Sequence, residues 1–218
     1  MKSSRTLLVL LTLGIAAVSM PARASTLLSV SGPIFSNSGI GLAPLQQAAA
    51  VSFTTANALN GVDLTALGGG SVPLTVDAYL TNSLGPGTTA ANVVASNTFV
   101  SALGDHQPET AFANLDLGPG TYYMLLVALG ESNLTGWDLT YSPTVTAVPG
   151  LSYGTSYVSP DIADAGGFPP ASADFFTSAQ TGGATLLFSI SPTAAVPEPA
   201  SAVLLASGLL LCLRKRME

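Results

Sequence analysis

The sequence predicts an all-β protein whose body is an antiparallel β-sandwich with a jelly-roll-like arrangement. Two observations lead to this class: apolar residues recur at every second position rather than with helical spacing, and turns rich in Gly and Pro separate the short apolar runs. Roughly nine to eleven short strands at such spacing are typical of a sandwich or jelly roll. A right-handed β-helix is the alternative, but the body has no fixed short repeat to support it.

The expected strands follow one another along the body. The clearest one-sided strand covers residues 72–80, where apolar and polar residues alternate. Residues 121–129 (TYYMLLVAL) are apolar on both faces, so we expect a central strand buried between two layers. The other alternating runs are 51–53, 62–66, 111–117 (Ala111, Ala113, Leu115 and Leu117 on one face), 134–141, 145–148, 151–153 and 186–190. Turns are expected at 60–61, 68–70, 85–87, 118–120, 149–150 and 166–167.

Residues 1–24 have the parts of a secretory signal peptide. Lys2 and Arg5 form a positive start, and residues 7–18 form an apolar stretch. As a helix this stretch would rise about 18 Å, well short of a roughly 30 Å membrane core, which argues against a transmembrane helix. The expected cleavage site, which makes the body begin near residue 25, consists of Ala22, Ala24 and Ser25.

The C-terminal residues 196–218 contain a second set of signals. Pro197, Glu198 and Pro199 precede an uncharged apolar segment, residues 200–213. A basic stop closes that segment and consists of Arg214, Lys215 and Arg216. Basic residues after an apolar helix lie on the cytoplasmic side, so we expect a short transmembrane helix with the body, residues 25–195, outside. The two prolines keep the preceding peptide extended and accessible to a membrane protease.

This tail resembles the PEP-CTERM sorting signal of exported proteins from Gram-negative bacteria that make extracellular polysaccharide. The same tail is also labelled the C-terminal domain of ice-binding proteins, a label that by itself implies no ice binding. The resemblance implies recognition by an exosortase through residues 197–199, then processing and release or attachment at the cell surface. Segments 78–81, 85–92 and 120–123 are similar to ectodomains of the same group. An ordinary hydrophobic tail anchor is the alternative.

Composition excludes several kinds of function. Charged residues make up 8% of the chain, against roughly 25% in a typical soluble domain, and no Lys or Arg occurs between residues 24 and 213. Without cations the body cannot neutralise nucleic-acid phosphates, and it has no P-loop or Schiff-base lysine. The single cysteine, Cys212, lies in the tail, and His106 is the one histidine, which excludes disulfides and multi-histidine zinc sites in the body.

The body is strongly acidic. Between residues 25 and 195 it has ten acidic residues: Asp63, Asp77, Asp105, Glu109, Asp116, Glu131, Asp138, Asp161, Asp164 and Asp174. Because no Lys or Arg faces them, we expect no internal side-chain salt bridge. The carboxylates should instead be solvated, accept hydrogen bonds from backbone or Ser/Thr groups, or bind external cations.

Three groups of residues are candidates for chemistry. Residues 150–154 match the G-x-S-x-G pattern around Ser152, but a nucleophile elbow needs a helix after the serine, and the following residues favour a strand. His106 lies between Asp105 and Glu109, a possible metal set or an ordinary solvated loop. The third group consists of Asp161, Asp164 and Asp174. Its expected metal is calcium, which prefers oxygen ligands on flexible loops. Paired carboxylates also serve glycoside hydrolysis, but no hydrolase motif accompanies them.

Aromatic residues are the remaining candidates. Aromatic rings with a polar edge suit sugars, and the candidates are Tyr122, Trp137, Tyr141, Tyr153 and Tyr157. The alternative, which we favour, places Trp137 and one face of the Tyr122–Tyr123 segment in the core.

Taken together, these features lead us to expect a non-enzymatic surface or matrix protein. Its expected partners are signal peptidase and the export machinery, an exosortase-type protease and extracellular polysaccharide, with no nucleic acid and no cofactor other than possible Ca²⁺. The alternatives are a carbohydrate- or calcium-binding module and a secreted hydrolase.

Overall fold

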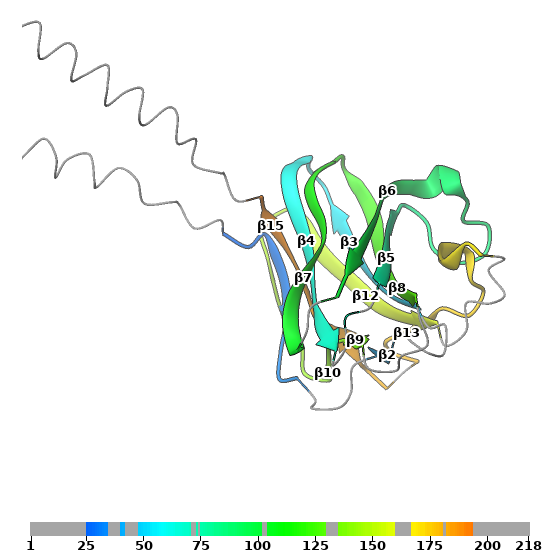
Figure 1. Cartoon of the computed structure of the whole chain (residues 1–218). Coiled ribbons are helices and arrows are strands. Elements are labelled where there is room, and N and C mark those ends of the chain that lie inside the picture. Colours follow the sequence, from blue (N-terminus) through cyan, green and yellow to red (C-terminus); the bar gives the residue numbers. More distant parts are fainter. Residues whose placement is uncertain are drawn as a thin grey trace, which may run out of the picture. The chain divides into compact units, whose positions relative to one another are not determined.

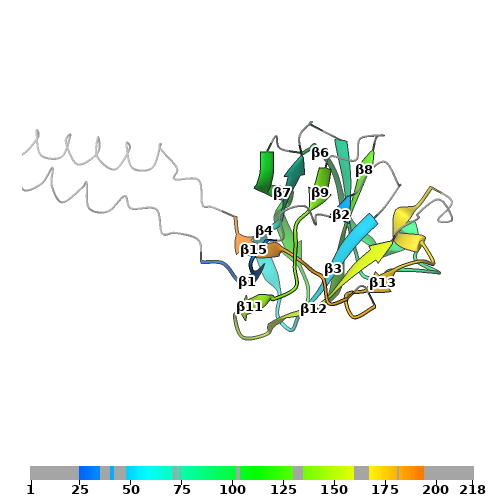
Figure 2. The same ribbon diagram turned by 90° about the horizontal axis from the view of Figure 1, so that it is seen from below.

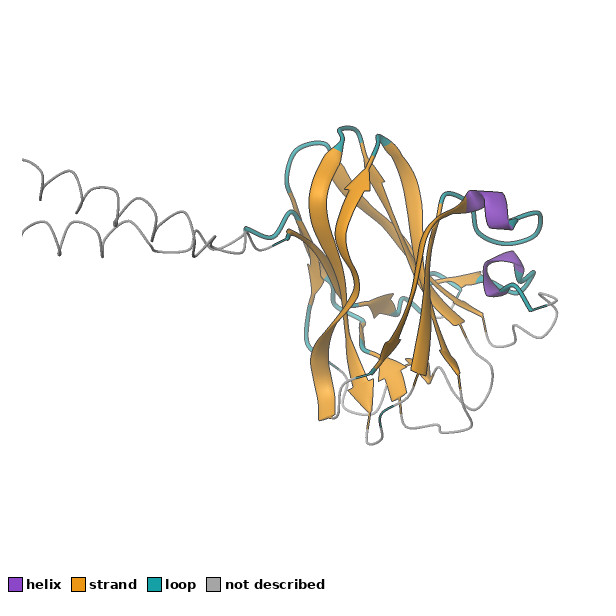
Figure 3. Ribbon diagram, turned by 45° about the horizontal axis from the view of Figure 1, so that its top comes forward, coloured by secondary structure: helices purple, strands orange, loops and turns teal. Residues whose placement is uncertain are grey.

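The computed structural model describes residues 25–34, 40–41, 48–70, 73, 75–101, 104–129, 135–159, 167–180 and 182–193 (Figure 1). They belong to one compact unit, Ser25–Thr193. This unit is all-β with antiparallel pairing, and no α-helix occurs among the described residues (Figure 3). Two short 3-10 turns, η1 (Ala90–Asn92) and η3 (Pro169–Ala171), accompany the strands. The expected signal peptide and the expected C-terminal helix lie outside the described residues.

The first sheet has seven strands. Its order is β11-β1-β15-β4-β9-β2, and β7 also pairs with β4. The strands are β1 (Leu28–Ser31), β2 (Ile40–Gly41), β4 (Leu59–Gly70), β7 (Gly104–Leu117), β9 (Thr135–Trp137), β11 (Thr144–Ala147) and β15 (Phe188–Pro192). Every pairing within this sheet is antiparallel.

The second sheet has six strands in the order β13-β12-β3-β8-β5-β6. These strands are β3 (Ala48–Thr55), β5 (Thr75–Thr81), β6 (Val93–Val100), β8 (Gly120–Leu129), β12 (Leu151–Ser159) and β13 (Phe176–Thr177). A separate two-stranded ladder joins β10 (Leu139–Thr140) and β14 (Thr185–Leu186).

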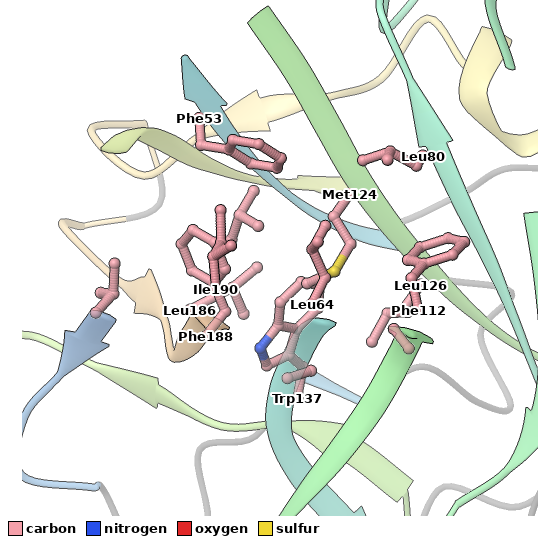
Figure 4. Close-up of a cluster of buried hydrophobic side chains, with 14 of the residues drawn as sticks. Phe53, Leu64, Leu80, Phe112, Met124, Leu126, Trp137, Leu186, Phe188 and Ile190 are labelled. Atoms are coloured by element: carbon pink, nitrogen blue, oxygen red, sulfur yellow. The ribbon is translucent and has the colours of Figure 1, made fainter. Parts of the chain in front are cut away.

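One hydrophobic cluster receives side chains from both sheets. In the first sheet Leu64 and Ile190 are fully buried, and in the second Phe53 and Met124 are fully buried (Figure 4). The ring of Phe53 in β3 lies 6.3 Å from the ring of Phe188 in β15, so aromatic contacts cross from one sheet to the other. Burial of this shared cluster is the main favourable contribution to folding of the unit.

The strands β3 and β8 are buried on both faces. A second cluster on the outward face of their sheet contains Ala48, Ala50, Leu125 and Val127. This arrangement confirms the prediction that residues 121–129 form a central strand. The alternation predicted at residues 51–53 is confirmed, because Val51 and Phe53 belong to the shared cluster and polar Ser52 lies between them. The outward residues Ala48 and Ala50 earlier in β3 are covered as well.

The predicted one-sided strand near residues 72–80 corresponds to β5, in which Val76, Ala78 and Leu80 are buried and the residues between them are half-buried. This element is confirmed. Its inward residues join the shared cluster.

Two β-bulges account for errors in the expected pattern along β4 and β7. Asn60-Gly61 was expected to form a turn, but Gly61 lies inside β4 with φ 58°, where the pairing with β7 shifts register. Asn114 has φ 56° inside β7 and lies where the register between β4 and β7 shifts a second time. The bulge leaves Ala113 exposed and buries Phe112. Extra residues in one strand of a pair break the two-residue period, so the single face expected for 111–117 was wrong there.

The two ends of the described unit lie next to each other (Figure 2). Leu28 in β1 is paired with Ile190 in β15, and the amide of Leu27 donates a 2.8 Å hydrogen bond to the carbonyl of Ile190. The strand β15 is held on both sides, since it pairs with β1 and with β4. Thr193 is fixed in the same place because its hydroxyl donates a 2.6 Å hydrogen bond to Asp63 Oδ1.

Candidate functional site

Most of the residues singled out in the terminal segments lie outside the described residues. These are Ala22, Ala24, Pro197, Glu198, Pro199, Arg214, Lys215 and Arg216. Ser25, the expected first residue of the mature protein, is the first described residue and is exposed. Among the described residues, no helix is long and apolar enough to cross a membrane.

Only part of the expected calcium loop can be placed. Asp161 and Asp164 lie outside the described residues, whereas Asp174 is exposed and its amide donates a 3.3 Å hydrogen bond to Ser172 Oγ. No cluster of three or more His, Cys, Asp or Glu side chains suited to a metal ion occurs in the described part of the chain. Calcium binding at this loop stays a prediction.

The G-x-S-x-G segment has a structural explanation. Ser152 lies inside strand β12, is exposed, and pairs with Thr54 of β3. The strand continues to Ser159, so Ser152 has no strand–helix elbow around it. Gly150 has φ 87°, which the turn from β11 to β12 requires. Gly154 leaves room for the side chain of Ser52 on β3.

The side chain of Asp105 lies outside the described residues, so the expected metal set of His106 with Asp105 and Glu109 stays a prediction. His106 Nδ1 lies 2.9 Å from Oδ2 of Asp138, a residue between β9 and β10. Asp138 is 7% exposed, while the imidazole stays accessible to solvent. This pair is an ion pair whenever the imidazole is protonated. The expectation of no internal salt bridge considered only Lys and Arg as cations, and this pair is an exception to it when the imidazole is protonated.

Most of the candidate sugar-stacking rings are in the core. Trp137 is 1% exposed, and the ring of the buried Tyr122 stacks on Phe53 at 5.6 Å. Tyr153 packs on Phe188 and its hydroxyl lies 2.9 Å from Ser156 Oγ. Burial raises the pKa of Tyr153 above its ordinary value, and the Ser156 hydrogen bond opposes that shift. These positions confirm the alternative that Trp137 and Tyr122 are core residues.

The other two candidate rings lie at the surface. Tyr141 is 47% exposed. Tyr157 is half-buried on the outward face of the second sheet, with its ring 5.9 Å from that of Tyr123. Burial, and to a smaller extent the neighbouring Tyr157, raises the pKa of Tyr123.

Three carboxylates accept hydrogen bonds in the way that the cation-free composition predicts. Asp63 Oδ1 accepts from the amide of Asn114 at 2.9 Å as well as from Thr193. Asp116 Oδ1 accepts from the amide of Gly61 at 2.9 Å. The third carboxylate, Asp77, accepts a 2.7 Å hydrogen bond from Thr98 Oγ1.

A polar hollow lies over β5 and β6. It has a volume of about 340 Å³ and is lined by Asp77, Ala78, Tyr79, Ser96, Asn97 and Thr98. Burial raises the pKa of Tyr79, and the nearby Asp77 carboxylate adds to the shift. Asn97 is already engaged, since its side-chain amide donates a 2.8 Å hydrogen bond to the carbonyl of Ala111 in β7.

The outward face of the seven-stranded sheet presents a row of hydroxyl groups. Ser29 of β1 is directly opposite Thr146 of β11 on one side and Ser189 of β15 on the other. The row continues because Ser189 is opposite Thr65 of β4, and Thr65 is opposite Thr110 of β7. We call these five residues the hydroxyl row. Adjacent strands lie about 4.8 Å apart, so the row spans roughly 19 Å across five strands.

A groove of about 210 Å³ lies over the three middle residues of the hydroxyl row and does not include Thr146 or Thr110 in its lining. Ser29, Thr65 and Ser189 line it together with Ser31, and apolar residues that include Leu67 and Pro108 complete the lining. No charged residue lines it. Thr65 and Thr110 have their hydroxyl oxygens 3.4 Å apart. The hydroxyls of Ser29 and Ser189 make no hydrogen bond to another described residue.

The hydroxyl row was not anticipated from the sequence, although a signal is present. Serine or threonine recurs at every second position in 29–31, 144–146 and 189–191, opposite to the apolar alternation. The sequence pattern alone does not place these segments beside one another, and only the strand order makes them a continuous surface.

No protein-family model matches the chain, and neither the curated proteins nor the solved structures include a significant match. The PEP-CTERM resemblance of the tail therefore stays a prediction based on its residues.

Proposed function

We propose that this chain is a non-enzymatic surface or extracellular-matrix protein of a Gram-negative bacterium that associates with extracellular polysaccharide. It is exported across the cytoplasmic membrane, held there transiently by residues 200–213, and sorted by an exosortase-type protease. The observation that carries the proposal is the tail, in which the Pro-Glu-Pro motif at 197–199, the apolar segment and the basic stop at 214–216 follow in order.

The fold of the body supports this proposal. We infer that the two antiparallel sheets form a sandwich of jelly-roll type, because residues of both sheets bury one cluster. The adjacent ends at Leu27 and Ile190 place both attachment points on one side of the body.

The charge of the body suits an extracellular location. Residues 25–195 have no Lys or Arg and ten acids, so uncompensated negative charge opposes self-association. Ions outside the cell screen this charge, and three carboxylates, those of Asp63, Asp77 and Asp116, have polar partners within the fold.

The sorting step is tested by deleting residues 197–199 in the producing bacterium. We expect the variant to stay in the membrane fraction with its tail uncut, as detected with an antibody against residues 200–218. Deletion of residues 194–196 is the matched control, because it shortens the same segment by the same length and keeps the motif; we expect this variant to be processed. Normal processing of the 197–199 deletion, or full-length uncut protein in the cytosol of the wild type, would contradict the proposal.

A further inference from the structure

We propose that the groove over the middle of the hydroxyl row binds an uncharged polysaccharide chain that runs across strands β1, β15, β4 and β7. This inference rests on the proposed function, because it assigns a surface of the body to the expected polysaccharide. The expected ligand is uncharged and fits the groove. It would contact the protein through hydrogen bonds between hydroxyl groups and through the neighbouring apolar surface.

The chemistry of the groove matches that of a neutral sugar chain. A pyranose ring presents C–H groups on its faces and hydroxyl groups around its edge. The groove has the corresponding pair of features, with hydroxyls from Ser29, Thr65 and Ser189 beside apolar Leu67 and Pro108. Each hydroxyl can donate one hydrogen bond and accept others, so the row can pair with sugar hydroxyls in either sense.

The arrangement is held ready for binding. The hydroxyls of Ser29 and Ser189 are not engaged by other described residues, so a ligand needs to displace only water from them. The three central strands are hydrogen-bonded to one another in register, and short Ser and Thr side chains lose little rotamer freedom when they bind. The four strands that line the groove span roughly 14 Å, which is long enough to contact consecutive sugar units.

Charge selects a neutral chain over an acidic one. The groove lining contains no charged residue, and the body has no Lys or Arg to attract carboxylate or sulfate groups. Its carboxylates repel such a polymer. The hollow over β5 and β6 is a poorer candidate, because Asp77 brings a negative charge into its lining and Asn97 is bound to Ala111.

The test uses the protein as the bacterium exports it and measures its retention on cellulose, its binding to dextran and its binding to alginate. The first variant combines Ser29→Ala, Thr65→Val and Ser189→Ala, which removes three hydroxyls with little change of volume, and valine is well suited to a strand. The second variant, Thr65→Gln, fills the groove with an uncharged side chain. The matched control combines Thr54→Val, Ser96→Ala and Thr121→Val, which removes three exposed hydroxyls from the second sheet.

We expect the wild type to bind at least one of the neutral polymers and not alginate. Both groove variants should bind at least about tenfold more weakly than the wild type. The control should bind like the wild type. Wild-type strength in either folded groove variant would overturn the proposal, as would equal loss in the control or binding to alginate alone. Absence of wild-type binding to both neutral polymers would also overturn it.

The two proposals fail in different experiments. Absent or groove-independent binding by a protein that is exported and has its tail processed overturns the groove and leaves the proposed sorting intact. Uncut protein in the cytosol overturns the sorting proposal, whatever the protein binds.

Discussion

The indole Nε1 of Trp137 donates a 2.7 Å hydrogen bond to the backbone carbonyl of Leu187, and the tryptophan side chain is 1% exposed. This bond links the end of β9 to the residue that separates β14 from β15. The amide of Leu187 in turn donates a 2.9 Å hydrogen bond to the carbonyl of Asp138. Trp137 therefore contributes both packing and a backbone connection, and its ring is not available to a ligand.

Replacement of Trp137 should destabilise the fold strongly. We expect Trp137→Ala to lower the free energy of unfolding by roughly 3–5 kcal/mol, because it leaves a cavity in the shared cluster. Trp137→Phe should cost less but still about 1–3 kcal/mol, since it removes the donor to the Leu187 carbonyl. Urea unfolding measures both changes. Tyr141→Ala, at a ring that is 47% exposed, is the control and should cost much less; similar costs at the two positions would contradict the burial of Trp137.

The close approach of β12 to β3 predicts a steric effect at Gly154. A methyl group there would collide with Ser52 Oγ, which also accepts a 2.9 Å hydrogen bond from the amide of Thr155. We expect Gly154→Ala to cost about 1–3 kcal/mol in thermal or urea unfolding. Adding Ser52→Ala should recover part of this cost. Gly118→Ala is the control, because its new methyl group would meet nothing closer than 4.0 Å.

Because of the backbone conformation at Asn114, a glycine substitution at residue 114 should affect stability differently from one at the neighbouring residue 113. Because Asn114 has φ 56°, Asn114→Gly should leave stability unchanged or slightly higher, and Asn114→Ala should cost about 1 kcal/mol. The hydrogen bond from the backbone amide of residue 114 to Asp63 Oδ1 should persist in both variants. Ala113→Gly next to it has no positive φ to relieve and should cost about 0.5–1 kcal/mol. A loss of stability in Asn114→Gly as large as in Ala113→Gly would speak against the bulge.

Alkaline pH should destabilise the protein through three half-buried tyrosines. Burial raises the pKa of Tyr79, Tyr123 and Tyr153 above the ordinary 10.0, so the folded state binds these protons more tightly than the unfolded state. Their contribution to stability is complete below the ordinary pKa and is lost as pH rises through the folded values. Urea unfolding at a series of alkaline pH values should show this decline. Tyr153→Phe should show a shallower decline, and an unchanged slope in that variant would contradict the assignment.

The sequence predicted those parts of the fold that depend on local alternation. The pattern of β5 and the two-sided burial of β8 follow from residue type at successive positions, so both could be predicted. The bulges at Gly61 and Asn114 could not, because a bulge is a mismatch between two strands and only the pairing reveals it.

The candidate site was less predictable for the same reason. The hydroxyl row combines residues from five segments of the chain, and its existence depends on strand order rather than on any one segment. The contact between His106 and Asp138 likewise joins positions 32 residues apart. The sequence did indicate that carboxylates would take backbone and threonine partners, because that followed from composition alone.

The position of β15 has a mechanical consequence. This strand ends at Pro192, on the N-terminal side of residues 200–213, which we propose as the anchor, and it is hydrogen-bonded to neighbours along both edges. Tension on Thr193 therefore acts along the strand and must shear two ladders at once, whereas an edge strand could be peeled away one bond at a time. Ser189 belongs to the same strand, so force from a polymer bound in the proposed groove would pass along β15 toward the proposed anchor.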